Sequence, residues 1–62
     1  MPSIEENIVN TQSVIEDIKE LLKIYHRECG EEFGFSDEDL DVCLGECDNI
    51  KKSLIKIYEI VD

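Results

Sequence analysis

The fold is decided by residues 30–36, which read GEEFGFS in one-letter code and connect two long amphipathic segments. Gly30 can end a helix, because glycine readily adopts the left-handed backbone conformation that follows many helix C-termini. Ser36 can begin the next helix, because its hydroxyl accepts hydrogen bonds from the free N–H groups of a first turn. A short stretch with these two residues at its ends predicts a reversal of the chain between two helices.

The segment before this turn has the hydrophobic spacing of a helix that packs along one seam. Its apolar positions alternate steps of four and three residues, which is typical of a coiled coil. They are Ile4, Ile8, Thr11, Ile15, Ile18, Leu22, Tyr25 and Cys29. Ser3 and Glu6 predict a capping box at the start. We therefore expect a helix over about residues 4–29.

The segment after the turn repeats the pattern. Its seam positions are Leu40, Cys43, Cys47, Ile50, Leu54, Ile57 and Val61. Three acidic residues, 37–39, follow Ser36, and negative charge is favourable in the first turn of a helix. We expect a helix over about residues 37–61. The predicted fold is all-α: one domain, residues 1–62, forming an antiparallel, coiled-coil-like two-helix hairpin with an acidic turn at residues 30–36.

Apolar side chains also lie beside both seams. Those in the first helix are Val14, Leu21 and Ile24, and those in the second are Leu44, Ile55, Tyr58 and Ile60. They are either scattered surface residues or part of a stripe wider than two helices can bury, which suits a bundle of three or four helices. A helix of another protein could complete such a bundle. Our expectation is a homodimer that forms a four-helix bundle.

Composition limits the classes of function. The chain has 62 residues and a net charge of −10, with 6 Lys and Arg against 16 Asp and Glu. Nine of the acidic residues and none of the basic ones fall within residues 28–48. This charge opposes direct binding to nucleic acid or to anionic membranes, which both need Lys and Arg. So small a chain also lacks room for a deep small-molecule pocket, and we expect no cofactor.

The location of the protein is predicted from segments that the sequence lacks. No apolar run approaches 18 residues, and the start of the chain has no hydrophobic signal-peptide core. Three cysteines are an odd number, which suits a reducing compartment better than a closed disulfide framework. We expect a cytoplasmic protein.

The only histidine and the three cysteines gather near the predicted turn, as in some zinc sites. They are His26, Cys29, Cys43 and Cys47. The predicted register places Cys47 about 10 Å along the axis from Cys29, whereas thiolates on one zinc lie within about 4 Å of each other. We therefore expect no metal site, cysteines that fill the seam as small hydrophobic residues, and a solvated His26.

The acidic turn is the main candidate for a functional surface. A region of one charge sign steers a partner of opposite charge, and Phe33 and Phe35 stand among the carboxylates. The alternative is a solvated turn in which the two phenylalanines close the end of the hairpin. We assign partner binding to Glu31, Glu32, Phe33, Phe35, Asp37, Glu38, Asp39 and Asp41.

Three short motifs resemble the small sporulation regulators of the stage-zero sporulation protein E-like family. Residues 15–19 (IEDIK) look like the family's Ile-Glu-x-Leu-Arg, and residues 34–39 (GFSDED) look like its Gly-Leu-Ser-Asp-Pro-Glu. Residues 44–48 (LGECD) stand where the family has Ser-Gln-Glu-Leu-Asp, so that Glu46 and Asp48 match. The resemblance covers about residues 15–58.

This resemblance implies a helical hairpin whose second helix lies along the active site of a response regulator. It implies an aspartyl-phosphate phosphatase, in which a polar side chain orients the attacking water. Glu46 and Asp48 are then the catalytic candidates, because Gly45 stands in place of the family's glutamine. That replacement favours a relative that binds the regulator without hydrolysis over an enzyme, and an aspartyl-phosphate phosphatase is left as the alternative.

Three functions are left open by the sequence. The first is binding to a protein with a basic or response-regulator-like surface, with or without phosphatase activity. The second is inhibition of a nucleic-acid-binding protein by an acidic surface that mimics phosphate charge, as in small phage anti-defence proteins. The third is a structural bundle module whose turn has no binding role. All three are compatible with a homodimer.

Overall fold

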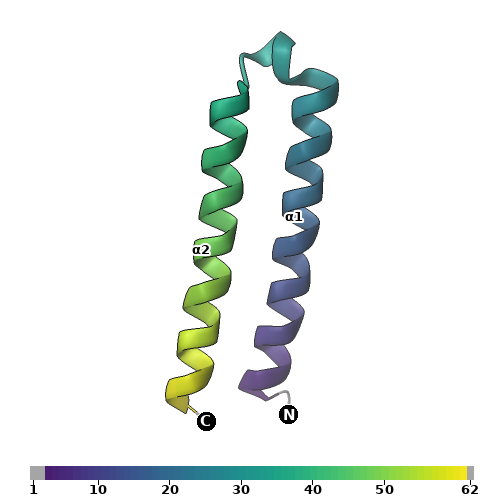
Figure 1. Ribbon diagram of the computed structural model, residues 1–62. Helices are drawn as coiled ribbons and strands as arrows, with labels where there is room; N and C mark the ends of the chain where they lie inside the picture. Colours follow the sequence, from purple (N-terminus) through teal and green to yellow (C-terminus); the bar gives the residue numbers. More distant parts are fainter. Residues whose placement is uncertain (1–2, 62) are drawn as a thin grey trace.

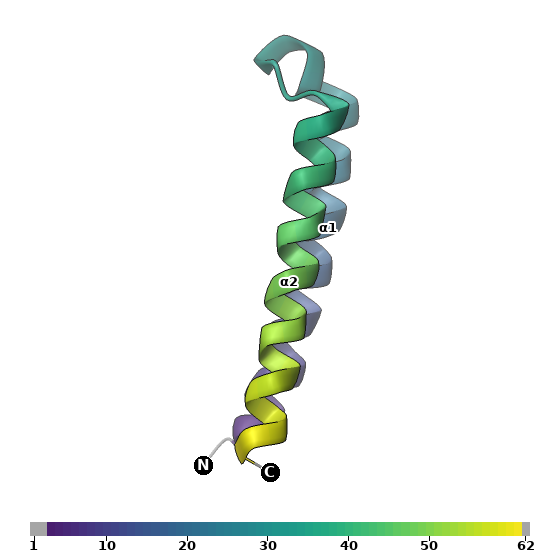
Figure 2. The same ribbon diagram turned by 60° about the vertical axis from the view of Figure 1, so that its left-hand side comes forward.

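The computed structural model describes residues 3–61, which form two antiparallel α-helices joined by a tight turn (Figure 1). Helix α1 spans Ile4–Phe33 and helix α2 spans Asp37–Val61. Figure 1 shows the helices side by side, and Figure 2, turned by 60°, shows α2 in front of α1 along the same length, with the turn at one end of the hairpin and the two termini at the other. The hairpin measures 44 × 20 × 11 Å. The predicted all-helical hairpin is confirmed.

The bounds of the second helix agree with the sequence prediction, whereas α1 ends one turn later than the predicted residue 29. The connection therefore comprises residues 34–36 and not residues 30–36. Residues 1, 2 and 62 of the predicted domain lie outside the described residues.

Two glycines, four residues apart, explain where α1 ends. Gly34 adopts the left-handed conformation, with φ 71° and ψ 22°, and its N–H donates to the Gly30 carbonyl oxygen. The Phe35 N–H donates to the same oxygen at 2.7 Å. Gly30 lies inside the helix, where a Cβ atom would be 2.9 Å from the Phe35 carbonyl oxygen. The predicted end at Gly30 is wrong because Gly34 supplies the left-handed residue, whereas Gly30 permits the turn to approach the helix.

Serine side chains cap the start of both helices, as predicted. The Ser3 hydroxyl accepts a hydrogen bond from the Glu6 N–H at 3.0 Å. At α2 the capping box is complete: the Asp39 N–H donates to the Ser36 hydroxyl at 3.1 Å, and the Ser36 N–H donates to the Asp39 carboxylate at 3.2 Å. Each such cap typically stabilises a helix by about 1 kcal/mol.

The predicted seam is correct for only part of its length. The buried hydrophobic residues among residues 3–61 are Ile8, Ile15 and Cys47. The other seam residues that become half-buried are Leu22, Cys29, Leu40, Cys43 and Leu54. The remaining predicted seam residues are exposed, namely Ile4, Thr11, Ile18, Tyr25, Ile50, Ile57 and Val61. The contrast is large, because Ile15 is 7% exposed and Ile18 is 41% exposed.

The two helices meet along a neighbouring stripe. In α1 the buried or half-buried residues Ile8, Ile15 and Leu22 are each followed, four positions later, by another interface residue. These residues are Gln12, Lys19 and His26. In α2 it takes Leu44, Lys51 and Tyr58. A helix turns by about 100° per residue. Because the interface uses the residue four positions after each buried one, and not the residue three positions after it, each helix is rotated and Ile18 and Ile50 lie outside the interface. The aliphatic stems of the lysines can pack in the interface while their ammonium groups reach carboxylates across it.

Candidate protein-binding surfaces

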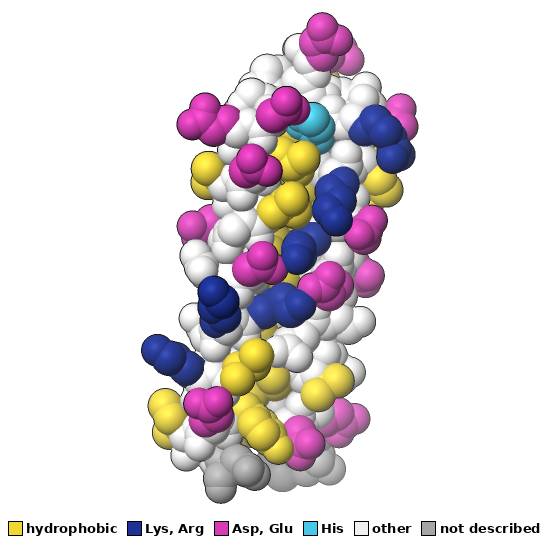
Figure 3. Space-filling view, in the orientation of Figure 1, with side chains coloured by type: hydrophobic (Ala, Val, Ile, Leu, Met, Phe, Trp, Pro, Cys, Tyr) yellow, Lys and Arg dark blue, Asp and Glu magenta, His cyan; other side chains and the backbone are white. Residues whose placement is uncertain are grey.

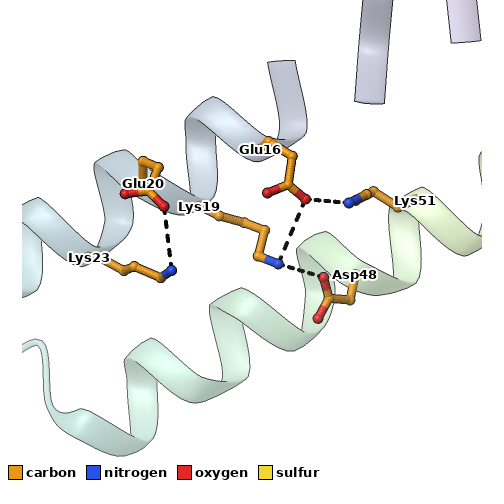
Figure 4. A network of polar contacts seen from close by, with 6 residues as sticks. All are labelled: Glu16, Lys19, Glu20, Lys23, Asp48 and Lys51. Carbon is orange, nitrogen blue, oxygen red and sulfur yellow. Dashed lines mark hydrogen bonds and ion pairs between the residues drawn. The ribbon is translucent and has the colours of Figure 1, made fainter. Parts of the chain in front are cut away.

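A cross-helix ion-pair network joins the middle of the two helices (Figure 4). Lys19 Nζ lies 2.8 Å from Asp48 Oδ1 and 3.9 Å from Glu16 Oε1. Lys51 of α2 donates a hydrogen bond to the same Glu16 carboxylate. We call these four residues the clasp. The Lys19 side chain is only 19% exposed, so its stem is part of the helix interface.

The clasp shifts the pKa of three of its members. The hydrogen bond from Lys51 lowers the pKa of Glu16 from its usual 4.5. The hydrogen bond from Lys19 lowers the pKa of Asp48 from its usual 3.8, and the same bond raises the pKa of Lys19 above its usual 10.5. Each shift favours the charged form, so the ion pairs stabilise the hairpin only while all partners are ionised.

We expect the clasp to make stability depend on pH in two ranges. Carboxylates with lowered pKa values contribute stability that is present at neutral pH and is lost as the pH falls below about 4.5 through their folded-state pKa values. The contribution of Lys19 is lost as the pH rises above 10.5 through its raised pKa. Urea unfolding of Glu16→Gln/Asp48→Asn, followed by circular dichroism, should show a deficit relative to the natural chain at pH 7 that shrinks toward pH 3.

A matched control is Asp17→Asn/Glu20→Gln, which removes the same charge from the same part of the hairpin. Asp17 has no ion pair among residues 3–61, and Glu20 pairs only within α1, with Lys23 at 3.5 Å. Its deficit at pH 7 should be smaller, because no cross-helix bond is removed. Equal behaviour of the two double variants would contradict a role for the clasp.

The clasp has an approximate two-fold arrangement. Glu16 and Lys19 in α1 correspond to Asp48 and Lys51 in α2, and each lysine bonds the acid of the other helix. The surrounding residues, IEDIK at 15–19 and CDNIK at 47–51, share this order of acid and lysine. The sequence alone did not predict the clasp, although the shared order of acid and lysine in these two pentapeptides is the pattern that could have revealed it.

Most of the exposed isoleucines lie on the face of the hairpin opposite the clasp, whereas Ile55, four residues after Lys51, lies on the clasp side. Counted from the buried Ile15 and Cys47, the clasp residues stand at +1 and +4, on one side of each helix. Residues at +3 and −1 stand on the other side, because of the 100° turn per residue. Because the two helices have an approximate two-fold arrangement, the +3 and −1 positions of α1 and of α2 lie on the same face of the hairpin. This apolar face comprises Ile4, Val14, Ile18, Leu21, Tyr25, Ile50, Ile57 and Ile60, which are between 40% and 83% exposed.

The aromatic residues of the turn have two different environments. Phe35 is half-buried and packs edge to face against Tyr25, with ring centroids 5.3 Å apart, and against His26 at 6.1 Å. Phe33 stacks on Tyr25 at 6.2 Å, yet it remains 65% exposed. The alternative that the phenylalanines close the hairpin is therefore correct for Phe35, whereas Phe33 presents apolar surface at the tip.

Some predicted binding residues have partners within the hairpin. Asp37 Oδ1 lies 2.7 Å from His26 Nε2, and Asp39 forms the capping box of α2. The prediction of a solvated His26 is wrong, because its ring is half-buried beneath Phe35 and bonded to Asp37. Asp37 therefore joins the start of α2 to α1, whereas Asp39 caps α2.

The other acidic residues of the turn region stay free. Glu31, Glu32, Glu38 and Asp41 are exposed, and none has an ion pair or side-chain hydrogen bond among residues 3–61. Figure 3 shows the basic side chains in a diagonal band across the face in view, with acidic side chains at the turn end and also elsewhere on that face. We call Glu31, Glu32, Glu38, Asp41 and Phe33 the tip surface. An open hollow beside it is lined by His26, Arg27, Glu28, Glu31, Phe35, Ser36 and Asp37.

Glu46 and Asp48, the catalytic candidates, lie on different sides of α2. Residues two apart on a helix do not face each other. Asp48 belongs to the clasp, whereas Glu46 is exposed and lies in line with Ile50, on the side of the apolar face. The arrangement therefore does not bring the two carboxylates together on one substrate.

The cysteines are free thiols, with Cys47 buried and Cys29 and Cys43 half-buried. Within residues 3–61, no three His, Cys, Asp or Glu side chains gather in a way that could hold a metal ion. Over the same range, neither helix contains a stretch that is long and apolar enough to cross a membrane.

Comparison of the chain with protein-family models, with curated proteins and with solved structures found no match.

Proposed function

We propose that this chain is a small regulatory protein that acts by binding another protein. In this proposal the tip surface docks on a basic or response-regulator-like surface of the partner. Two copies of the hairpin associate through their apolar faces into a four-helix bundle. The three free cysteines support a reducing compartment, and we propose a cytoplasmic location.

The observation that carries the docking proposal is the unpaired charge of the tip surface. Four of the six basic side chains already have carboxylate partners within the hairpin, namely Lys19, Lys23, Arg27 and Lys51. The four tip carboxylates have none, so a basic partner can bind them without breaking an internal ion pair. Exposed Phe33 beside them adds apolar contact area, which charged groups alone do not supply.

The bundle proposal rests on how little the hairpin buries. A compact monomer of 7.2 kDa has an accessible surface of about 4,100 Å², whereas this chain exposes 4879 Å². The excess is close to the roughly 800 Å² that each partner contributes to a standard interface. Patches of this kind on a small protein mark interaction sites, and the apolar face combines residues of both helices.

Binding is better supported than hydrolysis as the activity. Asp48 is engaged by Lys19 at 2.8 Å and serves the hairpin itself. Glu46 then lacks a neighbouring carboxylate, and Gly45 supplies no side chain to orient water. We therefore propose a binding-only relation to a response regulator where the partner is of that class.

Mimicry of nucleic acid is the second candidate, and the same unpaired carboxylates favour it. A groove that binds phosphates presents Lys and Arg at close spacing, and a surface of free carboxylates can occupy it. This candidate differs from the first in one consequence: DNA or RNA should compete with the protein for its partner.

Affinity capture from the native host at two salt concentrations tests the docking surface. The test variant is Glu31→Gln/Glu32→Gln/Glu38→Gln/Asp41→Asn. We expect binding to weaken about tenfold, because each of four exposed charge contacts contributes about 0.3–0.4 kcal/mol. Binding of the natural chain should also weaken as salt rises.

The matched control is Glu5→Gln/Glu6→Gln/Asp17→Asn/Glu59→Gln, which removes four charges away from the tip surface. It should bind like the natural chain. Equal losses in both variants would attribute binding to net charge alone, and no loss in the tip variant would exclude the tip surface as the docking site. Added DNA or RNA that displaces the captured protein would favour mimicry.

A further inference from the structure

Charge is unevenly distributed along the apolar face. Its positions in the half nearest the termini are uncharged, from Ile4 to Leu21 in α1 and from Ile50 to Ile60 in α2. Toward the turn the charged residues on the same side of α1 are acidic. Glu28 and Glu32 stand seven residues after Leu21 and Tyr25.

This gradient distinguishes the two ways in which a second copy can cover the face. In a parallel arrangement the turn ends lie together, so each of these acids approaches its own counterpart, and the two free tip surfaces add to the repulsion. In an antiparallel arrangement each turn end lies against the terminal half of the other copy. Glu28 and Glu32 then lie beside the uncharged terminal half of the other copy, and the two acidic turn ends lie at opposite ends of the dimer, where salt screens their repulsion.

The terminal half is also the better neighbour for another reason. Residues 28–48 hold nine acidic and no basic residues, whereas the rest of the chain holds seven acidic and six basic ones. An antiparallel contact pairs a strongly negative end with a nearly neutral one. A two-fold axis perpendicular to the hairpin produces this contact from two identical faces, as closed homodimers require.

We propose that the second copy packs antiparallel on the apolar face, so that the dimer carries one acidic tip surface at each end. This proposal rests on the proposed bundle and adds its orientation. The two tips then point in opposite directions, about 44 Å apart for full overlap of the hairpins. The dimer is therefore a two-ended ligand, suited to a basic partner that presents two separate copies of its binding site.

Photocrosslinking in mixed dimers tests the orientation. Tyr25→p-benzoylphenylalanine places a crosslinker of similar shape near the turn end of the apolar face. Mixing it with ¹⁵N-labelled natural chain, under conditions where sedimentation shows a dimer, identifies crosslinks between copies by mass spectrometry. We expect the labelled peptides to lie in the terminal half of the partner, within residues 4–14 or 53–61. The reciprocal variant Ile57→p-benzoylphenylalanine should label residues 18–33 of the partner, and it covers the case in which the Tyr25 variant fails to fold.

The control probe is Lys52→p-benzoylphenylalanine, because Lys52 is exposed and, four residues after Asp48, lies on the clasp side of α2. It should give no crosslink to the labelled chain. A dimer in which the Tyr25 probe labels the turn half of its partner would overturn the orientation and leave the bundle intact. A chain that sediments only as a monomer at high micromolar concentration would overturn both.

Discussion

Ile15→Ala is expected to destabilise the hairpin by about 2–5 kcal/mol, a large part of what so small a domain can have. Ile15 is 7% exposed and is one of three buried hydrophobic residues among residues 3–61. Its removal leaves a cavity between the helices that few neighbours can fill. Urea unfolding followed by circular dichroism should show an early midpoint or no folded baseline, at low and at high protein concentration alike.

Ile18→Ala is the matched control, because Ile18 has the same side chain three residues along the same helix. In the isolated hairpin it is 41% exposed, so its truncation should cost about 1 kcal/mol or less. In the proposed dimer it lies within the bundle core. Its loss should then appear mainly as weaker concentration dependence, since dimers gain about 1.4 kcal/mol per tenfold increase in concentration. Equal effects of the two variants at every concentration would contradict the rotated interface.

Gly30→Ala and Gly45→Ala are expected to change stability in opposite directions. Alanine is preferred to glycine inside a helix by about 1 kcal/mol, and both residues lie inside helices. At Gly45 a new Cβ meets nothing within 4 Å, so the full gain should be observed. At Gly30 the Cβ would lie 2.9 Å from a backbone oxygen, that of Phe35, and 3.4 Å from the His26 ring.

That contact cannot be relieved by rotating a side chain, because the Phe35 N–H is bonded to the Gly30 carbonyl at 2.7 Å. Overpacking of this kind costs typically 1–3 kcal/mol, and the helix preference for alanine offsets about 1 kcal/mol of that cost, so we expect a net loss of up to about 2 kcal/mol in Gly30→Ala. In thermal and urea unfolding, Gly45→Ala should therefore be more stable than the natural chain and Gly30→Ala less stable. Stabilisation by both would mean that the turn does not approach α1 at Gly30.

Local signals in the sequence predicted the parts of the fold that depend on neighbouring residues. The caps at Ser3 and Ser36 and the bounds of α2 follow from short-range hydrogen bonding, and both were found where predicted. The end of α1 was predicted incorrectly, because the chain offers two glycines one turn apart. The choice between Gly30 and Gly34 depends on where Phe35 packs, which no local rule contains.

The interface shows a second limit. Ile8, Ile15 and Leu22 belong to two possible stripes, one that adds the residues three positions later and one that adds the residues four positions later. The sequence prediction used the first stripe because its residues are more hydrophobic. The helices use the second, because Lys19 and Lys51 combine apolar stems with charges that match acids on the opposite helix. The tip surface was predicted as a region, but which of its acids are free depended on His26 and Ser36, whose partners are set by the packed turn.

The shape of the hairpin has a consequence for how it folds. Contacts at the turn, such as Tyr25 with Phe35, close short loops, whereas contacts near the termini close loops that span nearly the whole chain. Loop-closure entropy therefore favours formation from the turn outward, like a zipper. The turn end, which forms first, also carries the free carboxylates. We expect ionic strength to act mainly on the rate of folding. Salt screens the repulsion between the tip carboxylates, and these groups are brought together in the step that forms the turn.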